Sequence, residues 1–559
     1  MRRNADGRPA PGRRASREPG VPAPLTNDRD ENPTATGPLE RIAAWILRGP
    51  LVVSLVVLCL AQLATWAPHY LTWPWHVDFD VLATLARGWT EGKLPYRDLR
   101  CDNFPGAIEQ FWIVGHLFGR GATWSFYACD VGLLLAWLGL LLTWSRVRLH
   151  AVLPGAVAAA FVLTHYLASD LTCVAQRDWH APMLALAAIM ICELSAGAAS
   201  IAFAAALTAC ACAIRPQVVL FLPAIALALA QTRRAAGGGA IAVGRGWLVG
   251  VAWLAVDLAA LFAPLYLGGI FGDFQRGVGR ALYGRPYNHV GLMHIARRLL
   301  LQALVARNLL IPIVLVVLYS AGRPGTRALI RTWLPALLGA WFYKPLSPSP
   351  YPYLDHPLAL ANAIGAGLAA AVLVDRLDVS SRVRLAALLC LIGLGVAPRP
   401  AYCGLGWTRQ GLRDLSAGVM PHRPPAGYVL DYADPATRDR VWTSYRDAIV
   451  FLKYRTEPEA EVINLLLEPL ALCAPSERMT AMPFESLFWL LVDAGDETAV
   501  ERALEDAGPR VRVVWSPDAP PSAIFPNLSA AVVRLTPVVR RNYLLEKNFG
   551  DVEIWRRRP

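Results

Sequence analysis

Charged residues are scarce in this 559-residue chain. They make up 17% of the sequence, whereas apolar residues make up 55%, and the mean hydropathy is +0.37. A soluble domain usually carries about 25% charged residues. The apolar residues also gather in nearly charge-free blocks that are long enough to cross the hydrocarbon core of a bilayer. These blocks are 51–66, 131–144, 181–198, 247–267 and 299–319. Composition therefore argues against a soluble protein and indicates one that crosses a membrane many times.

Several common functional signals are also absent. The ten cysteines form no CxxC pair and have no metal-type spacing, although Cys403 and Cys473 could pair in an oxidising compartment. The region after residue 399 has no glycine-rich phosphate loop and no triad-like motif. No internal repeat occurs, which disfavours transporters built from duplicated halves. The net charge of +12 does not indicate nucleic-acid binding, because the basic residues lie in short clusters between the apolar blocks.

The N-terminus shows no cleavable signal peptide. Its first apolar block begins more than 40 residues into the chain, and no small-x-small cleavage site follows that block. We therefore expect the block to remain as a membrane anchor. Residues 1–40 are rich in Arg, Pro, Gly and Ala without apolar periodicity, which predicts a disordered basic tail.

The apolar pattern predicts a polytopic α-helical membrane domain over residues 41–398. We place eleven spans in it, near 48–67, 127–144, 151–168, 181–197, 199–214, 216–231, 246–267, 299–320, 329–343, 356–374 and 383–398. If the Arg-rich N-terminus is cytoplasmic, every inside loop is basic, as the positive-inside rule requires. The first outside loop is then 68–126. Within it, 105–119 is apolar but short and carries Glu109, Gln110 and His116, which suits an amphipathic helix at the membrane surface.

The character of the chain changes after residue 399. Strand-like runs at 461–467 and 510–515 alternate with helix-like runs at 441–454, 497–507 and 528–543. This alternation predicts a C-terminal α/β domain over 399–559. An odd number of spans places this domain on the extracytoplasmic side of the cytoplasmic (inner or plasma) membrane.

One outside loop, 268–298, is basic, contrary to the positive-inside rule. It contains Arg276, Arg280, Arg285, Arg297 and Arg298. Two interpretations stay open. The loop is either a structured surface segment or a site that captures an anionic headgroup, since guanidinium groups match phosphate geometry.

Carboxylates concentrate in the same outside region. The first outside loop contains Asp78, Asp80, Asp98 and Asp102, and the second contains Gln176, Arg177, Asp178 and His180. Taken singly, each aspartate suits a helix cap or a turn. If the two loops converge, Asp78 or Asp80 together with Asp178 would form a cluster suited to deprotonating an acceptor or to holding a divalent metal. No other cofactor is indicated. His356, which begins a predicted span beside Asp355, either contacts substrate or marks the membrane interface.

These motifs carry a resemblance to a known family. The stretch 78–106 resembles the first-loop signature of the GT-C superfamily, in the branch of protein O-mannosyltransferases and lipid A aminoarabinose transferases. The matching positions are Asp78, Ala86, Gly92, the Pro95-Tyr96-Arg97-Asp98 run, Asp102-Asn103 and Pro105-Gly106. Gln176 and Asp178 resemble the second acidic motif of the family. Arg215-Pro216 resembles a basic-Pro step between two spans, and 351–360 resembles a later outside motif.

The resemblance implies an integral membrane glycosyltransferase of the cell envelope. Such an enzyme moves a hexosyl or pentosyl group from a polyprenyl-phosphate donor to a lipid, glycan or protein acceptor, with inversion at the anomeric carbon. A first-loop aspartate acts as the base, which by position is Asp78. The candidates for holding the leaving phosphate are Arg177, Arg215 and Lys344, with the arginines of 268–298 in reserve. Further candidates for binding substrate are Tyr96, Arg97, Asp98, Asp102, His180 and His356.

Two positions depart from the family pattern. Phe79 stands where the family has Glu, with an acid one place later at Asp80, and Phe104 stands where a basic residue is usual. These departures keep a second interpretation open, a catalytically inactive scaffold with the same fold. A third is a transporter or flippase of lipid-linked saccharides, although its polar groups would be expected at mid-membrane. Polysaccharide ligases and polymerases fit less well, because they place key residues in a large loop between late spans.

Overall fold

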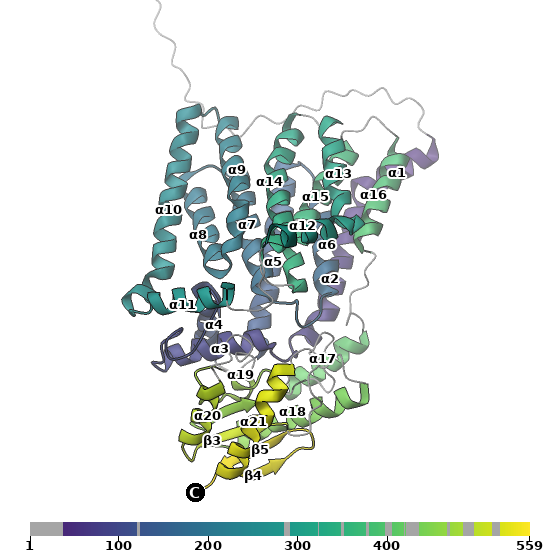
Figure 1. The fold of residues 1–559 in the computed structure, drawn as a ribbon. Helices are drawn as coiled ribbons and strands as arrows, with labels where there is room; N and C mark the ends of the chain where they lie inside the picture. The colour runs from purple at the N-terminus through teal and green to yellow at the C-terminus, as the bar shows by residue number, and fades with distance from the viewer. Residues whose placement is uncertain are drawn as a thin grey trace, which may run out of the picture.

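The computed structural model describes twelve stretches of the chain. They are residues 37–119, 123–283, 291–321, 324–347, 351–375, 380–396, 405–418, 420, 435–466, 470–484, 497–516 and 526–559. The predicted disordered tail, apart from residues 37–40, and Cys403 lie outside the described residues, whereas Cys473 is a free, buried thiol. The described chain forms a tall helical bundle with a smaller α/β domain at one end (Figure 1).

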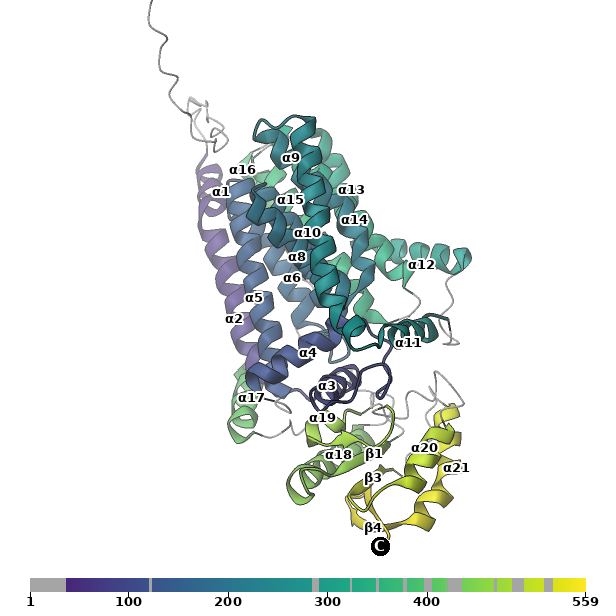
Figure 2. The ribbon, with the colours of Figure 1, turned by 90° about the vertical axis from the view of Figure 1, so that its left-hand side faces the viewer.

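Roughly parallel helices build the bundle (Figures 1 and 2). They are α1 (Pro38–Arg48), α2 (Pro50–Tyr70), α5 (Thr123–Arg148), α6 (Leu153–Leu167), α7 (Arg177–Leu194), α8 (Ala198–Ile214), η1 (Pro216–Phe221) continuing into α9 (Leu222–Ala235), α10 (Ala240–Leu267), α13 (Ala306–Ala321), α14 (Pro324–Leu346), η2 (Pro352–Asp355) continuing into α15 (His356–Asp375), and α16 (Ser381–Val396). Large apolar side chains on the outer helix α10 are exposed, among them Leu248 at 72% and Val251 at 64%. Such a surface is stable in lipid and not in water, which supports the prediction of an integral membrane protein.

The predicted count of eleven spans is not confirmed. By length and composition, five helical segments of the described chain can cross a membrane: Pro50–Tyr70, Trp124–Arg148, Pro216–Ala235, Ala240–Leu267 and Pro352–Val374. The apolar helices α6 and α8 are shorter than a full span. The predicted span 299–320 is divided, because α12 (Leu292–Leu304) ends before α13 begins and projects sideways from the bundle (Figure 2).

Three helices lie across the lower end of the bundle in Figures 1 and 2. They are α3 (Val77–Thr90) and α4 (Pro105–Phe118) from the first outside loop, and α11 (Phe271–Tyr283) from the basic loop. Pro105 suits the first turn of α4, where its missing N–H has no intrahelical partner to lose. A helix is therefore present where the amphipathic surface helix 105–119 was predicted, and it lies across the end of the bundle.

The C-terminal part has the predicted α/β character. Its sheet has the order β2-β1-β3-β5-β4, with β1 parallel to β2 and β3, and with β5 antiparallel to both β3 and β4. The strands are β1 (Glu461–Leu465), β2 (Met479–Thr480), β3 (Val511–Trp515), β4 (Tyr543–Asn548) and β5 (Glu553–Arg557), and the helices are α18 (Pro435–Arg455), α19 (Cys473–Ser476), α20 (Glu497–Asp506) and α21 (Pro526–Asn542). The predicted strands and helices are found, but β2, α19 and the final hairpin β4–β5 were not predicted.

One helix after residue 399 packs on the bundle instead of on the sheet. In α17 (Leu405–Ala417), Thr408 Oγ1 donates to the carbonyl oxygen of Thr65 on α2, at 2.8 Å. Gly411 allows the close approach, since a Cβ there would lie 2.4 Å from the backbone nitrogen of His69. α17 therefore joins the chain of the C-terminal region to the membrane bundle.

Candidate functional site

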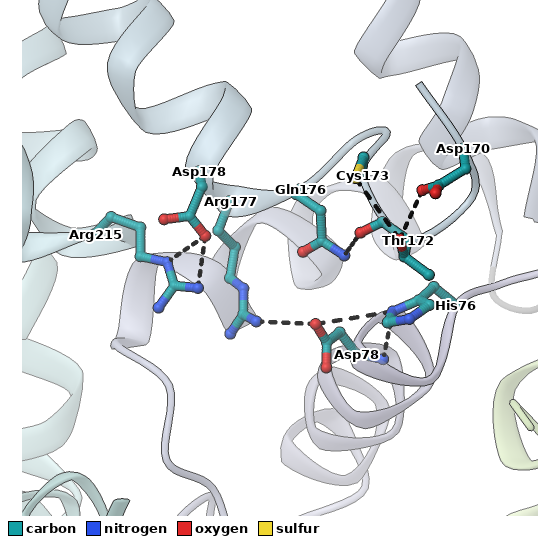
Figure 3. A network of polar contacts seen from close by, with 9 residues as sticks. All are labelled: His76, Asp78, Asp170, Thr172, Cys173, Gln176, Arg177, Asp178 and Arg215. Carbon is teal, nitrogen blue, oxygen red and sulfur yellow. Dashed lines mark hydrogen bonds and ion pairs between the residues drawn. The ribbon is translucent and has the colours of Figure 1, made fainter. Parts of the chain in front are cut away.

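The first turn of α3 presents Asp78 to the start of α7. His76 precedes α3 and caps it, with its Nδ1 accepting from the Asp78 amide at 3.3 Å. Asp78 Oδ2 lies 3.3 Å from Arg177 Nη2 and 3.8 Å from His76 Nδ1 (Figure 3). Burial lowers the pKa of His76, which keeps the ring neutral and able to accept the capping bond. The first and second outside loops therefore converge through the Asp78–Arg177 ion pair.

A second charged pair lies beside the first. Asp178, fully buried, accepts from Arg215 Nε at 3.0 Å and Nη2 at 2.7 Å, both on Oδ2, and from the hydroxyl of Tyr343 at 2.9 Å on Oδ1. Arg215 occupies the break between α8 and η1, where Pro216 prevents α8 from continuing. Asp178 thus holds Arg215 in place through Oδ2, and its Oδ1 accepts from Tyr343.

Arg177 has unused hydrogen-bonding capacity. The residue is 7% exposed, and its Nε and Nη1 have no hydrogen-bond partner among the described residues. A buried guanidinium with unpaired N–H groups is costly unless a ligand satisfies them, and its planar donors suit the oxygens of a phosphate. Tyr353 of η2 is buried within electrostatic reach of this group and of Asp78 and Arg215. Together these residues form what we call the charged centre: Asp78, Arg177, Asp178, Arg215, Tyr343 and Tyr353.

Asp80 is directed away from the charged centre. It is 1% exposed, and its carboxylate accepts from the amides of Leu472, Cys473 and Ala474, at 2.6, 3.0 and 2.6 Å. Burial raises the pKa of Asp80 to about 6, although the three amide bonds oppose that rise. Asp80 therefore fastens α19 of the C-terminal domain to α3. It does not join Asp78 and Asp178 in one carboxylate cluster.

Two predicted histidines also lie in other networks. His180 Nε2 is 2.7 Å from Asp130, which also accepts from the hydroxyls of Tyr70 and Tyr166. His356 Nε2 lies 2.6 Å from the carbonyl oxygen of Cys173, to which it must donate. Both rings are buried and connect helices, and neither hydrogen-bonds to a residue of the charged centre.

The Tyr96-Arg97-Asp98 motif shapes the first loop and joins it to α11. Arg97 donates to Asp273 at 2.9 Å and to the carbonyl of Gly269 at 2.5 Å. The Tyr96 hydroxyl donates to the carbonyl of Asn103 at 2.8 Å, and the Asp98 carboxylate accepts from the Leu94 amide at 2.7 Å. Asp102 is half-buried in the same loop. The hydrogen bonds of Tyr96, Arg97 and Asp98 thus lie within the first loop and between that loop and the segment that begins α11.

The remaining basic candidates have partners outside the charged centre or are exposed. Lys344 Nζ pairs with Asp355 at 2.7 Å, Arg298 donates to the carbonyls of Lys344 and Ser347, and Arg276 pairs with Asp273. Arg280 and Arg297 are exposed, and Arg285 lies outside the described residues. Among the residues described, no group of three or more His, Cys, Asp or Glu side chains has a geometry that could hold a metal ion.

Sequence reasoning missed two residues of the charged centre, Tyr343 and Tyr353. Tyr343 directly precedes the candidate Lys344, and Tyr353 lies within the motif 351–360. A tyrosine near a membrane interface is usually assigned to the aromatic belt, so only the contact with Asp178 distinguishes Tyr343.

The comparison with solved structures gives the fold. The crystal structure of ArnT from Cupriavidus metallidurans bound to undecaprenyl phosphate matches with a TM-score of 0.53, 14% identity, and coverage of 91% of this chain and 98% of that one. The chain has the fold of ArnT. The apo structure of ArnT from the same organism also matches, with a TM-score of 0.43 and 14% identity over 92% of this chain and 98% of that one. No family model and no curated protein matches the sequence. The predicted resemblance to the GT-C branch of lipid A aminoarabinose transferases is confirmed for the fold.

Proposed function

We propose that the chain is an inverting glycosyltransferase that takes a sugar from a polyprenyl-phosphate donor at the charged centre. ArnT, whose fold it shares, was crystallised with undecaprenyl phosphate bound. The observation that carries the proposal is the buried Arg177, which has unpaired N–H groups and lies 3.3 Å from the carboxylate of Asp78. An anion binder and a base are the two groups that this transfer needs, and they are adjacent.

The chemistry assigns a role to each group. Asp78 removes the proton of the acceptor hydroxyl while that oxygen bonds to the anomeric carbon. The bond from that carbon to the phosphate oxygen breaks on the opposite face, so the configuration inverts, and the electron pair leaves with the polyprenyl phosphate. Arg177 and Arg215 stabilise the charge that develops on the phosphate. Asp178 and Tyr343 orient Arg215. The transfer requires no metal in this scheme.

The two departures from the family pattern do not disturb this centre. Phe79 is buried in an aromatic cluster, with ring centroids 5.3 Å from Phe126 and 5.9 Å from Phe111. Phe104 packs against Phe274 at 5.5 Å. Both phenylalanines fill apolar space, and the Asp78–Arg177 pair does not depend on either. This separation favours an active enzyme over an inactive scaffold.

The placement of the charged centre also favours a transferase over a transporter. Asp78 of the centre lies in the first turn of α3, which crosses the end of the bundle that faces the α/β domain (Figure 1). We accordingly propose that residues 41–398 form the membrane domain, that 399–559 form an extracytoplasmic domain, and that the N-terminus is cytoplasmic in the inner or plasma membrane. The acceptor is a lipid, glycan or protein of the cell envelope.

Binding of undecaprenyl phosphate tests the anion site. The full chain is placed in lipid nanodiscs, and its affinity for undecaprenyl phosphate is measured for wild type, Arg177→Gln and Arg215→Gln. Because each loses charge-assisted hydrogen bonds, we expect affinity to fall about tenfold or more. Arg534→Gln is the matched control, since Arg534 forms an exposed ion pair with Glu497 in the C-terminal domain. Equal affinity in all four proteins would overturn the assignment of the charged centre as the phosphate site.

Envelope glycans test the transfer itself. Mass spectrometry compares cells that lack the protein with cells complemented by wild type, Asp78→Asn or the control Asp551→Asn, at equal membrane levels. We expect wild type and Asp551→Asn to restore a missing sugar and Asp78→Asn not to restore it. If Asp78→Asn restores the sugar fully, Asp78 is not the base. If deletion changes no glycan while undecaprenyl phosphate still binds, the inactive-scaffold alternative replaces the transferase.

A further inference from the structure

A separate cavity lies on the other side of α3. Its volume is about 250 Å³, and it lies between α3, α4, the start of α5 and residues 473–478 of the C-terminal domain. Three aromatic side chains, Trp75, Phe111 and Trp112, form part of its wall, together with the ring of His116. None of the residues of the charged centre lines it.

Two polar groups in this cavity lack a hydrogen-bond partner. Trp75 is 6% exposed and Thr84 is 4% exposed, and both line the cavity. Neither Trp75 Nε1 nor Thr84 Oγ1 has a partner among the described residues. Most buried donors and hydroxyls in folded proteins are paired, so two unpaired groups on residues that line one cavity indicate a ligand that completes them.

The charged residues that line the cavity already have polar partners, and Glu477 among them pairs with Lys453 at 2.7 Å. Arg87 pairs with Glu91 at 2.7 Å. Arg478 donates to the carbonyl oxygens of Lys453, Thr456 and Glu477, each at 3.0 Å. The cavity therefore offers no free guanidinium, which makes it a poor phosphate site and favours a neutral, hydroxyl-bearing ligand.

We propose that this cavity binds one neutral sugar ring. A sugar has apolar C–H faces that pack on aromatic rings, and hydroxyls that both accept from an indole N–H and pair with a threonine hydroxyl. The volume lies slightly below the roughly 300–1,000 Å³ of sites for drug-sized ligands, which suits a single ring better than a chain of sugars.

The geometry of α3 separates this saccharide site from the charged centre. Thr84 lies four residues after Asp80 and shares its face of the helix, toward α19. It lies six residues after Asp78, which places it about 9 Å along the axis and about 120° around it. The saccharide site is therefore distinct from the transfer centre and goes beyond the proposed function, on which it does not depend.

One wall of the site adjoins an exposed apolar face of α4. Trp112, which lines the cavity, is followed on α4 by the exposed apolar residues Ile113, Leu117 and Phe118. A helix with such a face lies in the interfacial region of a bilayer. Sugars carried at the outer surface of the membrane would reach the site from there.

Saturation-transfer NMR on the full chain in nanodiscs tests the proposal. The probes are the methyl glycosides of glucose, galactose, mannose and arabinose, and the proteins are wild type, Trp75→Phe and Thr84→Val. Each variant loses one hydrogen bond to the sugar, so we expect affinity for the best glycoside to fall about two- to tenfold. Thr84→Ser, which keeps the hydroxyl, should retain the affinity of wild type.

Thr90→Val is the matched control. Thr90 lines the same cavity on the same helix, but its hydroxyl already donates to the carbonyl of Ala86 at 3.1 Å. We expect this variant to bind like wild type. Thermal unfolding of every variant separates loss of binding from loss of fold.

Three results would overturn the saccharide site. The first is that none of the four glycosides binds. The second is that Asp78→Asn abolishes binding, whereas Thr84→Val and Trp75→Phe leave it unchanged. The third is that inorganic phosphate displaces the glycoside. The second result would place the sugar in the charged centre. If Asp78→Asn still transfers sugar while glycoside binding depends on Thr84 and Trp75, the proposed function fails and the saccharide site stands.

Discussion

The contact between Asp80 and α19 predicts how the C-terminal domain is held. One carboxylate accepts three backbone N–H groups, from Leu472, Cys473 and Ala474. Replacement by alanine leaves those donors buried without an acceptor, at about 1–3 kcal/mol each. The sum is about 3–9 kcal/mol. We expect the lower part of that range, about 3–5 kcal/mol, because the neighbouring cavity can admit water to two of the amides.

Hydrogen exchange read by mass spectrometry measures this cost in nanodiscs. Peptides covering residues 470–484 should lose protection in Asp80→Ala, and Asp80→Asn should lie between Asp80→Ala and wild type because it keeps one acceptor oxygen. Asp98→Asn is the control, since the Asp98 carboxylate is exposed and, among the described residues, accepts the amide of Leu94 alone. If protection of these peptides in Asp80→Ala stays within about 0.5 kcal/mol of wild type, the domain is held by other contacts and the reasoning is wrong.

The pKa of Asp80 gives this prediction a pH dependence. Burial raises the pKa to about 6 from the ordinary 3.8, so the folded state binds the proton more tightly than the unfolded state. The resulting stabilisation is complete below pH 3.8 and is lost as the pH rises through 6. Between pH 5 and 7.5 wild type should lose on the order of 1–1.5 kcal/mol relative to Asp80→Asn, which does not titrate. An identical pH dependence in both proteins would contradict the raised pKa.

Three further substitutions test the packing of the fold and the charged centre. Gly411→Ala should lower the stability of the bundle by about 1–3 kcal/mol in thermal unfolding, because its Cβ would lie 2.4 Å from the His69 backbone; an unchanged melting temperature would contradict the close approach. Phe79→Glu, which restores the family residue, should reduce the folded yield in size-exclusion chromatography, since it buries an unpaired carboxyl among aromatic rings; a normal yield would refute this. Tyr343→Phe should weaken undecaprenyl phosphate binding about two- to tenfold, because Asp178 keeps both hydrogen bonds to Arg215. This loss should be smaller than in Arg215→Gln, and a larger loss would contradict the reasoning.

Parts of the charged centre were predictable from the sequence, and others were not. Asp78, Arg177 and Arg215 follow from a family motif or from basic residues beside predicted spans, and the structure brings them to one end of the bundle. The sequence left Asp80 as an alternative to Asp78 in the carboxylate cluster, and both lie in the first turn of α3. Residues two apart on a helix point in nearly opposite directions, so one faces α7 and the other faces α19.

The sequence by itself determined the membrane character, the α/β nature of the C-terminal region and the surface helix α4. These properties follow from local composition and periodicity, which each segment carries without its neighbours. Only the tertiary structure decided which polar residues meet. It paired Asp78 with Arg177, set Asp80 against α19, and divided the predicted span 299–320 into α12 and α13. Such pairings depend on how distant segments pack, and no local pattern encodes the direction in which a side chain finds its partner.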